Sequence, residues 1–261
     1  MKTLVRSLAV LATLGLLAAS VAAEDLTVTF KTTGPQASGT SRQYYSSERM
    51  RSTDGERDMI FEYASGRIVT VDHKKKEYSE TTLAEIEQAM KAASAQMEQM
   101  RQQMESMPPA MREKMEQMMG GGEVTVTKGG TREIAGHKTQ QYTVTMGQSF
   151  KMDLWNTTDL KLPVPAVDLK KLASFTGPMA AMASNPMFKG FAQLAEKMKE
   201  IPGFTLADDT SMKMMGRGFE TSREATEVKS GPIPASDFDV AAIAKGYKKV
   251  ESPLTRMGRR K

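Results

Sequence analysis

The 261-residue sequence contains no cysteine, only two histidines and a single tryptophan. Without a thiol the chain can form no disulfide, no thiolate metal site and no cysteine-based active site, and it cannot carry a lipid on cysteine. The sequence also has no G-x-S-x-G or H-E-x-x-H pattern, no phosphate-binding loop and no dinucleotide-binding glycine pattern. His73 and His137 each precede a lysine in segments that resemble turns or strand edges, where a histidine is usually solvated. We therefore expect a protein that is not an enzyme and that needs no cofactor.

Long apolar runs are scarce, and the longest lies near the start of the chain. Lys2 and Arg6 precede an apolar stretch at residues 8–18, and Val21-Ala22-Ala23 then supplies the small residues typical of a signal-peptide cleavage site. The stretch is too short for a membrane-spanning helix, which needs about 20 apolar residues, and no later segment approaches that length. We predict that residues 1–23 are a cleaved signal peptide and that the protein is secreted to the periplasm.

An excess of charge of one sign is also missing, because 36 basic residues face 31 acidic ones and the formal net charge is +5. A nucleic-acid-binding protein would concentrate basic residues and interleaved aromatics on one face, so we expect no nucleic-acid partner. Basic residues gather instead in residues 252–261, which we interpret as a solvated tail that could make weak contact with anionic lipid head groups. Residues 24–251 are long enough to bury a core and are expected to form one domain.

Alternating apolar and polar residues predict short β-strands over most of the chain. In the first group, Leu26, Val28 and Phe30 alternate with threonines, and four strand-like segments follow, of which residues 40–50 are the first. A second group covers residues 123–155, and a third forms a hairpin over residues 204–229. Because strands joined by short turns remain neighbours, we expect about ten antiparallel strands in one curved sheet. Helical segments between the groups would cover its apolar face, which gives an α+β fold.

Methionine is abundant, with 22 residues, and it forms a stripe along one predicted helix. Thr81 or Thr82 is expected to cap the start of this helix, and Thr82 and Glu85 have the spacing of a capping box. Apolar residues then recur every three or four positions, as one helical face requires. The pattern continues after Pro108-Pro109 and ends at Gly120–Gly122, so that the predicted helical insertion spans residues 82–119. The stripe of the first helix consists of Leu83, Ile86, Met90, Ala93, Met97, Met100, Met104 and Met107.

Two further helices are predicted at residues 168–175 and 186–200, and the second again has methionines on its apolar side. Methionine is unbranched and polarisable, so it suits a surface that adapts to what it covers. The sequence leaves three occupants of the stripe open: the protein's own core, an apolar ligand, or a soft metal such as copper(I). Exposed methionines could also scavenge oxidants. The sulfurs that could bind copper(I) are those of Met97, Met100, Met104, Met107, Met111 and Met115.

Short segments along the chain resemble a known family in their order and spacing. They are Tyr44–Met50, Val71–Tyr78, Met107–Met115, Gly136–Tyr142, Leu160–Pro163 and Gly246–Val250. In this order they resemble the DUF4412 family of uncharacterised bacterial periplasmic proteins, which is related to the lipoprotein carriers LolA and LolB. The resemblance covers essentially the whole chain after residue 23, and it implies an unclosed, LolA-like half-barrel with a helical lid and an apolar cavity that accepts acyl chains. Family members often have a cysteine where this chain has Thr139.

The pattern and the resemblance together predict a non-enzymatic periplasmic protein that binds an acyl chain, a lipid, another apolar ligand or a partner such as a lipoprotein under a Met-rich lid. The alternative is a copper(I)-binding or oxidant-scavenging protein. Six to eight apolar side chains, each favouring burial by about 1.5–3 kcal/mol, would not remain in water. The predicted ligand-binding residues are Leu83, Ile86, Met90, Met97, Met100, Met104, Met107, Met187, Phe191, Leu194 and Met198.

Overall fold

The computed structural model describes residues 24–35, 38–89, 108, 123–147, 149–163, 189–214 and 217–252. The predicted signal peptide, nearly all of the basic tail and most of the Met-rich insertion lie outside these ranges, as does the helix predicted at residues 168–175. The described strands are β1 Leu26–Thr33, β2 Gly39–Tyr45, β3 Arg49–Thr53, β4 Arg57–Glu62, β5 Arg67–Asp72, β6 Glu77–Thr82, β7 Val124–Ile134, β8 His137–Met146, β9 Phe150–Thr157, β10 Phe204–Met214, β11 Arg217–Ser230 and β12 Lys248–Glu251. The described helices are residues 83–89, α5 Lys189–Lys199, the 3-10 helix η2 Ala235–Phe238 and α6 Val240–Ile243.

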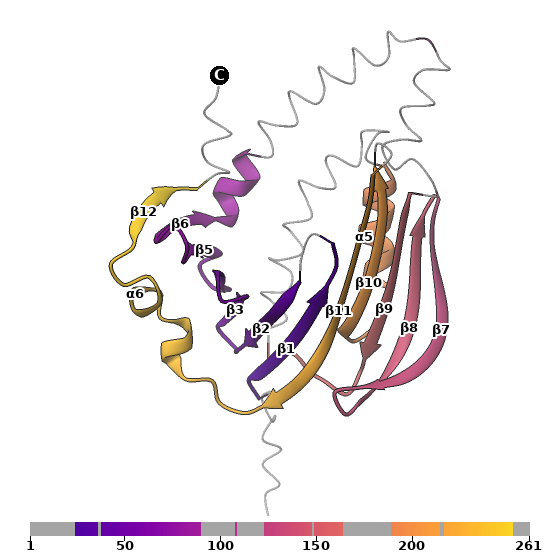
Figure 1. Cartoon of the computed structure of the whole chain (residues 1–261), viewed down its shortest axis with the longest axis horizontal. Coiled ribbons are helices and arrows are strands. Elements are labelled where there is room, and N and C mark those ends of the chain that lie inside the picture. The colour runs from indigo at the N-terminus through magenta and orange to yellow at the C-terminus, as the bar shows by residue number, and fades with distance from the viewer. Residues whose placement is uncertain are drawn as a thin grey trace, which may run out of the picture.

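The strands form one curved sheet that does not close (Figure 1). Their order is β12-β6-β5-β4-β3-β2-β1-β11-β10-β9-β8-β7, so β12 and β7 lie at its two edges. Neighbouring strands are antiparallel except β12 and β6, which pair in parallel. The prediction of one curved, unclosed antiparallel sheet is confirmed apart from this pair, whereas the predicted helical lid falls mainly on residues outside the described ranges.

The prediction of residues 40–50 as a single strand is wrong, because the chain turns at Ser46 between β2 and β3. The Ser46 Oγ atom accepts hydrogen bonds from the backbone N–H groups of Arg49 (3.0 Å) and Glu48 (3.3 Å). The N–H of Ser46 donates to the carbonyl of Arg49 at 2.9 Å. Serine side chains that bond nearby backbone in this way favour turns over continued strand pairing. This hairpin adds a strand that the alternating pattern does not predict.

Strand register divides the sheet into two faces, because directly paired residues point to the same side and successive residues alternate. One face carries apolar side chains from β5 to β7 in the strand order of the sheet, and we name it the apolar face. The other carries mainly threonine, serine and charged side chains between β1 and β9, and we name it the polar face. The apolar face comprises Ile68, Met59, Phe61, Met50, Tyr45, Leu26, Val28, Phe30, Leu154, Met152, Phe150, Val144, Met146, Val124 and Val126.

Helix α5 packs on the apolar face at the β7–β9 end of the sheet. Its Leu194 and Met198 side chains lie against a buried cluster of Val124, Val144, Met146, Leu154 and Ile201. A second cluster under β1 includes Leu26, Val28, Phe30 and Leu206. Each fully buried side chain of this size contributes about 1.5–3 kcal/mol, so these clusters are the main source of stability at this end.

The C-terminal segment covers the other side of the sheet, where it passes beside β3 to β6 (Figure 1). Val240 and Ile243 of α6, together with Ala244, pack against Ile60, Val69 and Val71 of β4 and β5. The chain then adds β12 beside β6, and Lys249 of β12 bonds Glu80 of β6 at 2.8 Å. Residues 231–251 therefore act as a strap, which we name the C-terminal strap, across one end of the sheet.

The predicted start of the Met-rich helix is confirmed. Residues 83–89 are helical, and Thr82 and Glu85 form the expected capping box. The N–H of Thr82 donates to Glu85 Oε2 at 2.8 Å, and the N–H of Glu85 donates to Thr82 Oγ1 at 3.2 Å. Ile86 is buried, and the N–H of Leu83 donates to the carbonyl of Gly66 at 3.0 Å. Among the described residues, no helix has the length and apolar character needed to cross a membrane.

Candidate functional site

The structure describes four of the predicted lid side chains. Leu83 and Ile86 lie in the first turns of the helix that begins the stripe, beside the β4–β5 turn. Leu194 and Met198 pack against the core cluster at β7–β9. Phe191 belongs to α5, but its side chain is not among those described. The residues outside the described ranges are Met90, Met97, Met100, Met104, Met107, Met111, Met115 and Met187, so the lid and copper(I) hypotheses both remain predictions.

The apolar face is the candidate binding surface, because some of its side chains are partly open beyond α5. Met59 of β4 is 42% exposed, and among the described residues it is the one large apolar side chain that is exposed. Met50 and Ile68 on the flanking strands are half-buried. Phe61 of the same face is buried, and its ring meets that of Tyr63 edge to face at 5.5 Å. Accessible apolar side chains on a curved sheet suit an apolar ligand or partner.

One ion pair interrupts the apolar face in the middle of the sheet. Arg223 of β11 donates from Nε (2.7 Å) and Nη2 (2.6 Å) to Asp208 Oδ1 of β10. The guanidinium lies over the ring of Phe30, 4.7 Å from the ring centroid. Register confirms the placement, since Arg223 pairs with Thr32, two residues beyond Phe30, and Asp208 pairs with Leu154. The side chains of Arg223 and Asp208 remain 33% and 18% exposed, so a ligand on this face could reach the pair.

Tyr45 contributes to the surroundings of this ion pair. Burial raises the pKa of Tyr45 to about 12, although the positive charge of Arg223 lowers it in part. The phenol therefore stays protonated at neutral pH, and it donates to Gln43 Oε1 at 2.6 Å. Its ring meets that of Phe204 edge to face at 5.6 Å. Tyr45 thus supplies apolar contact without adding a negative charge that would compete for Arg223.

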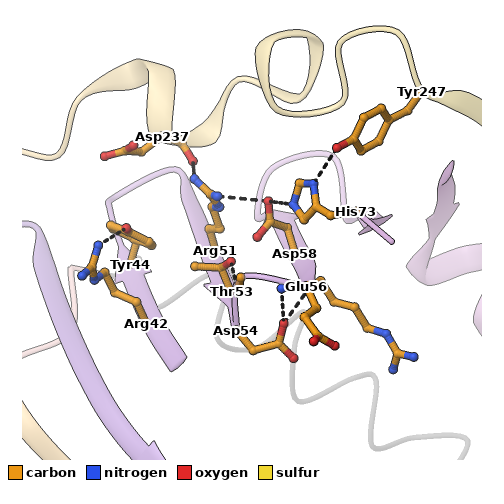
Figure 2. Close-up of polar contacts among 12 residues, drawn as sticks. Arg42, Tyr44, Arg51, Thr53, Asp54, Glu56, Asp58, His73, Asp237 and Tyr247 are labelled. Atoms are coloured by element: carbon orange, nitrogen blue, oxygen red, sulfur yellow. Dashed lines mark hydrogen bonds and ion pairs between the residues drawn. The ribbon is translucent and has the colours of Figure 1, made fainter. Parts of the chain in front are cut away.

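A second polar cluster joins the C-terminal strap to the sheet, and we name it the Asp58 clasp (Figure 2). Asp58 Oδ2 accepts a hydrogen bond from Arg51 Nη2 at 3.0 Å and lies 3.1 Å from His73 Nε2. His73 Nδ1 lies 3.0 Å from the Tyr247 hydroxyl. Arg51 Nη1 donates to the carbonyl of Asp237 at 2.8 Å. The contacts with the Tyr247 hydroxyl and with the Asp237 carbonyl therefore join the clasp to the C-terminal strap.

The Asp58 clasp explains why the sequence interpretation of His73 is wrong. The side chain of His73 is only 26% exposed, and both ring nitrogens have partners. Its partner Tyr247 is 174 positions away in the sequence, and no local pattern joins the two. A tyrosine, histidine and aspartate in line also resemble a proton relay. Asp58 at one end of this line belongs to β4, and Tyr247 at the other end belongs to the C-terminal strap that packs on the sheet. We therefore interpret the clasp as a structural contact that holds the strap to the sheet.

Thr139 stands where the predicted family resemblance would place a cysteine, and it is buried. Thr139 of β8 is 1% exposed, and its Oγ1 donates to the carbonyl of Arg132 at 2.7 Å.

A groove of about 370 Å³ opens on the polar face, with Lys151, Asp153, Asp209 and Glu220 among its lining residues. Within the described part of the chain, no group of three or more histidine, aspartate or glutamate side chains could hold a metal ion.

Comparison with protein-family models gives no match, and no curated protein matches the chain either. Several solved structures are distantly similar. An uncharacterised conserved protein from Thermus thermophilus aligns over 89% of this chain and 93% of its own, with 7% identity and a TM-score of 0.43. The MucA/MucB complex of Pseudomonas aeruginosa aligns over 82% of this chain and 54% of that chain, with 10% identity and a TM-score of 0.37. MucB alone aligns over 82% of this chain and 56% of its own, with 12% identity and a TM-score of 0.32. The chain thus spans about half the length of the MucB structures, and at these values the likeness assigns no function.

Proposed function

We propose that this protein binds an acyl chain or another apolar ligand on the apolar face of its sheet, as a non-enzymatic protein of the periplasm. The observation that carries the proposal is the difference between the two faces. Apolar side chains follow one face from Ile68 of β5 to Val124 of β7, whereas between β1 and β9 the other face carries residues such as Thr29, Asp153 and Asp209. An apolar face of this extent must be covered, either by the chain itself or by a ligand.

The helix that begins at residue 83 is the proposed lid over this face. Its capping box fixes where it starts, and Ile86 is buried against the fold. The apolar stripe continues along the sequence mainly as methionine. Methionine side chains have three rotatable bonds and repack around different shapes, which suits a cover that exchanges between ligands. The predicted relationship to the LolA-type carriers, which rests on the sequence resemblance alone, points to the same kind of ligand.

Binding of a fluorescent fatty acid to the mature protein tests this function. We expect saturable binding that unlabelled palmitate displaces. Met59→Asp should weaken binding by about tenfold or more, because a carboxylate beside an acyl chain loses its hydration without gaining a partner. The fluorescence titration should be repeated on Met59→Asp at matched protein concentration, with circular dichroism to show that the sheet is retained.

Thr40→Asp is the matched control, because Thr40 is an exposed strand residue of β2 that register places on the polar face. This variant should bind the fatty acid like the unaltered protein. Absence of saturable binding by the unaltered protein would exclude the proposed function. Equal weakening in the two variants would show that the acyl chain does not use the apolar face.

A further inference from the structure

Arg223 is a charged residue on the apolar face, where most neighbouring side chains are apolar or aromatic. The floor around it is apolar or aromatic: Phe30 under the guanidinium is 1% exposed, Leu206 belongs to the same core cluster, and Tyr45 packs against that cluster. Placing a charged pair on an apolar floor removes part of its hydration, and the attraction between the partners only partly offsets this loss. A role in stability alone is therefore a weak reason for an arginine at this position.

The geometry of the ion pair leaves part of the guanidinium available. Both bonds to Asp208 end on the same Oδ1 atom, from Nε and Nη2. An arginine has five N–H donors in a planar fork that fits carboxylate and phosphate oxygens. The Nη1 group of Arg223 has no hydrogen-bond partner among the described residues, and the side chain is one-third exposed. Within the described part of the chain, N–H donors of Arg223 thus remain free on the apolar face.

We propose that Arg223 binds the anionic end of an amphiphile whose acyl chain lies on the apolar face. This inference rests on the proposed function and narrows its ligand class to a single apolar chain with a carboxylate or phosphate at one end. The acyl chain would lie along the apolar side chains, while oxygen atoms of the head group would accept hydrogen bonds from the free N–H groups of the guanidinium. A charge-assisted hydrogen bond of this kind is stronger than a neutral one, particularly where water is partly excluded.

The test compares anionic and neutral ligands that share one acyl chain. Palmitate and hexadecyl phosphate are the anionic probes, and methyl palmitate is the neutral probe, each displacing a fluorescent fatty acid from the mature protein. We expect at least one anionic probe to bind about tenfold or more tightly than the methyl ester, which corresponds to about one charge-assisted hydrogen bond. Arg223→Gln should remove this preference while binding of the methyl ester changes little. The stronger of the two anionic probes identifies whether the head group is a carboxylate or a phosphate.

Arg132→Gln is the matched control, because Arg132 has the same two kinds of contact on the other face. Its guanidinium lies 4.3 Å from the Trp155 ring centroid, and its Nη2 pairs with Glu224 at 2.7 Å. This variant should keep the preference for the anionic probe. Arg223→Lys serves as a second variant should Arg223→Gln fold poorly, and we expect it to keep part of the preference because the charge remains.

The outcomes separate this inference from the proposed function. Equal binding of anionic and neutral probes by the unaltered protein would overturn the role of Arg223 and leave acyl-chain binding intact. If Arg223→Gln still bound the anionic probes more tightly than the methyl ester, the role of Arg223 would likewise be overturned and acyl-chain binding would stand. Failure of all three probes to bind would instead overturn the proposed function, and the inference would fall with it.

Discussion

Asp58→Ala is expected to lower the free energy of unfolding by about 3–5 kcal/mol, the usual cost of removing one partner from a buried ion pair. The Asp58 side chain is fully covered, and that of Arg51 is only 14% exposed. Without the carboxylate, the Arg51 guanidinium would keep its contact with the Asp237 carbonyl but would lose its counter-charge. His73 would also lose the partner of its Nε2 atom. The loss should therefore extend from β4 to the C-terminal strap.

Urea unfolding followed by circular dichroism measures this effect. Asp209→Ala is the matched control, because Asp209 is an exposed strand residue of β10, and surface substitutions of this kind usually change stability by less than about 0.5 kcal/mol. Tryptophan fluorescence is a poor substitute, since the sole tryptophan, Trp155, lies in β9, distant in strand order from the clasp. A loss below about 1 kcal/mol for Asp58→Ala would contradict the interpretation of the clasp as the tie that holds the strap.

Gly203→Ala is expected to cost about 3 kcal/mol, as the sum of a left-handed backbone penalty and steric overlap. Gly203 connects the α5 segment to β10 and has a φ of 88°, in the region that side chains with a Cβ rarely adopt. A Cβ at this position would also overlap the carbonyl oxygen of Thr157, which is backbone and cannot rotate away. Next to it, the Asn156 side chain donates to the carbonyl of Pro202 at 3.0 Å, so the local structure has little room to adjust.

Gly55→Ala measures the left-handed backbone penalty without the steric overlap. Gly55 has a similar φ of 84°, but a Cβ there would meet no atom within 4 Å. We expect this variant to cost only about 1–2 kcal/mol, the backbone penalty alone. Thermal unfolding of the two variants, together with the unaltered protein, gives the comparison. Equal losses at Gly203 and Gly55 would show that the α5–β10 junction relaxes around the new methyl group.

Local signals in the sequence predict the elements of this fold better than they predict its contacts. The capping box of Thr82 and Glu85 and the pairing of β10 with β11 were predictable because the residues involved are near one another in the chain. The turn at Ser46 was not, because Tyr44, Tyr45 and Met50 continue a strand-like pattern through it. Its signal was the Ser46-Ser47 pair, whose side chains favour turns.

The contacts of the candidate site were likewise not predictable from local sequence patterns. Arg223 and Asp208 stand in a polar hairpin sequence, and only the register of β10 and β11 with β1 and β9 places them on the apolar face beside Phe30. The partners His73 and Tyr247 are likewise brought together by the C-terminal strap. The strap itself ends in the parallel β12, and a four-residue strand at a sheet edge has too few residues for an alternating pattern to be visible.

The most direct test of the central claim, that an acyl chain lies on the apolar face, is photo-crosslinking with a diazirine-bearing palmitate analogue, followed by mass-spectrometric mapping of the labelled peptides. We predict labels on apolar-face residues of β3 to β5, including Met59, and on the helix that begins at residue 83. Excess palmitate should suppress these labels. Labels confined to polar-face residues such as Lys31 and Asp209, or labels that palmitate does not suppress, would contradict the claim.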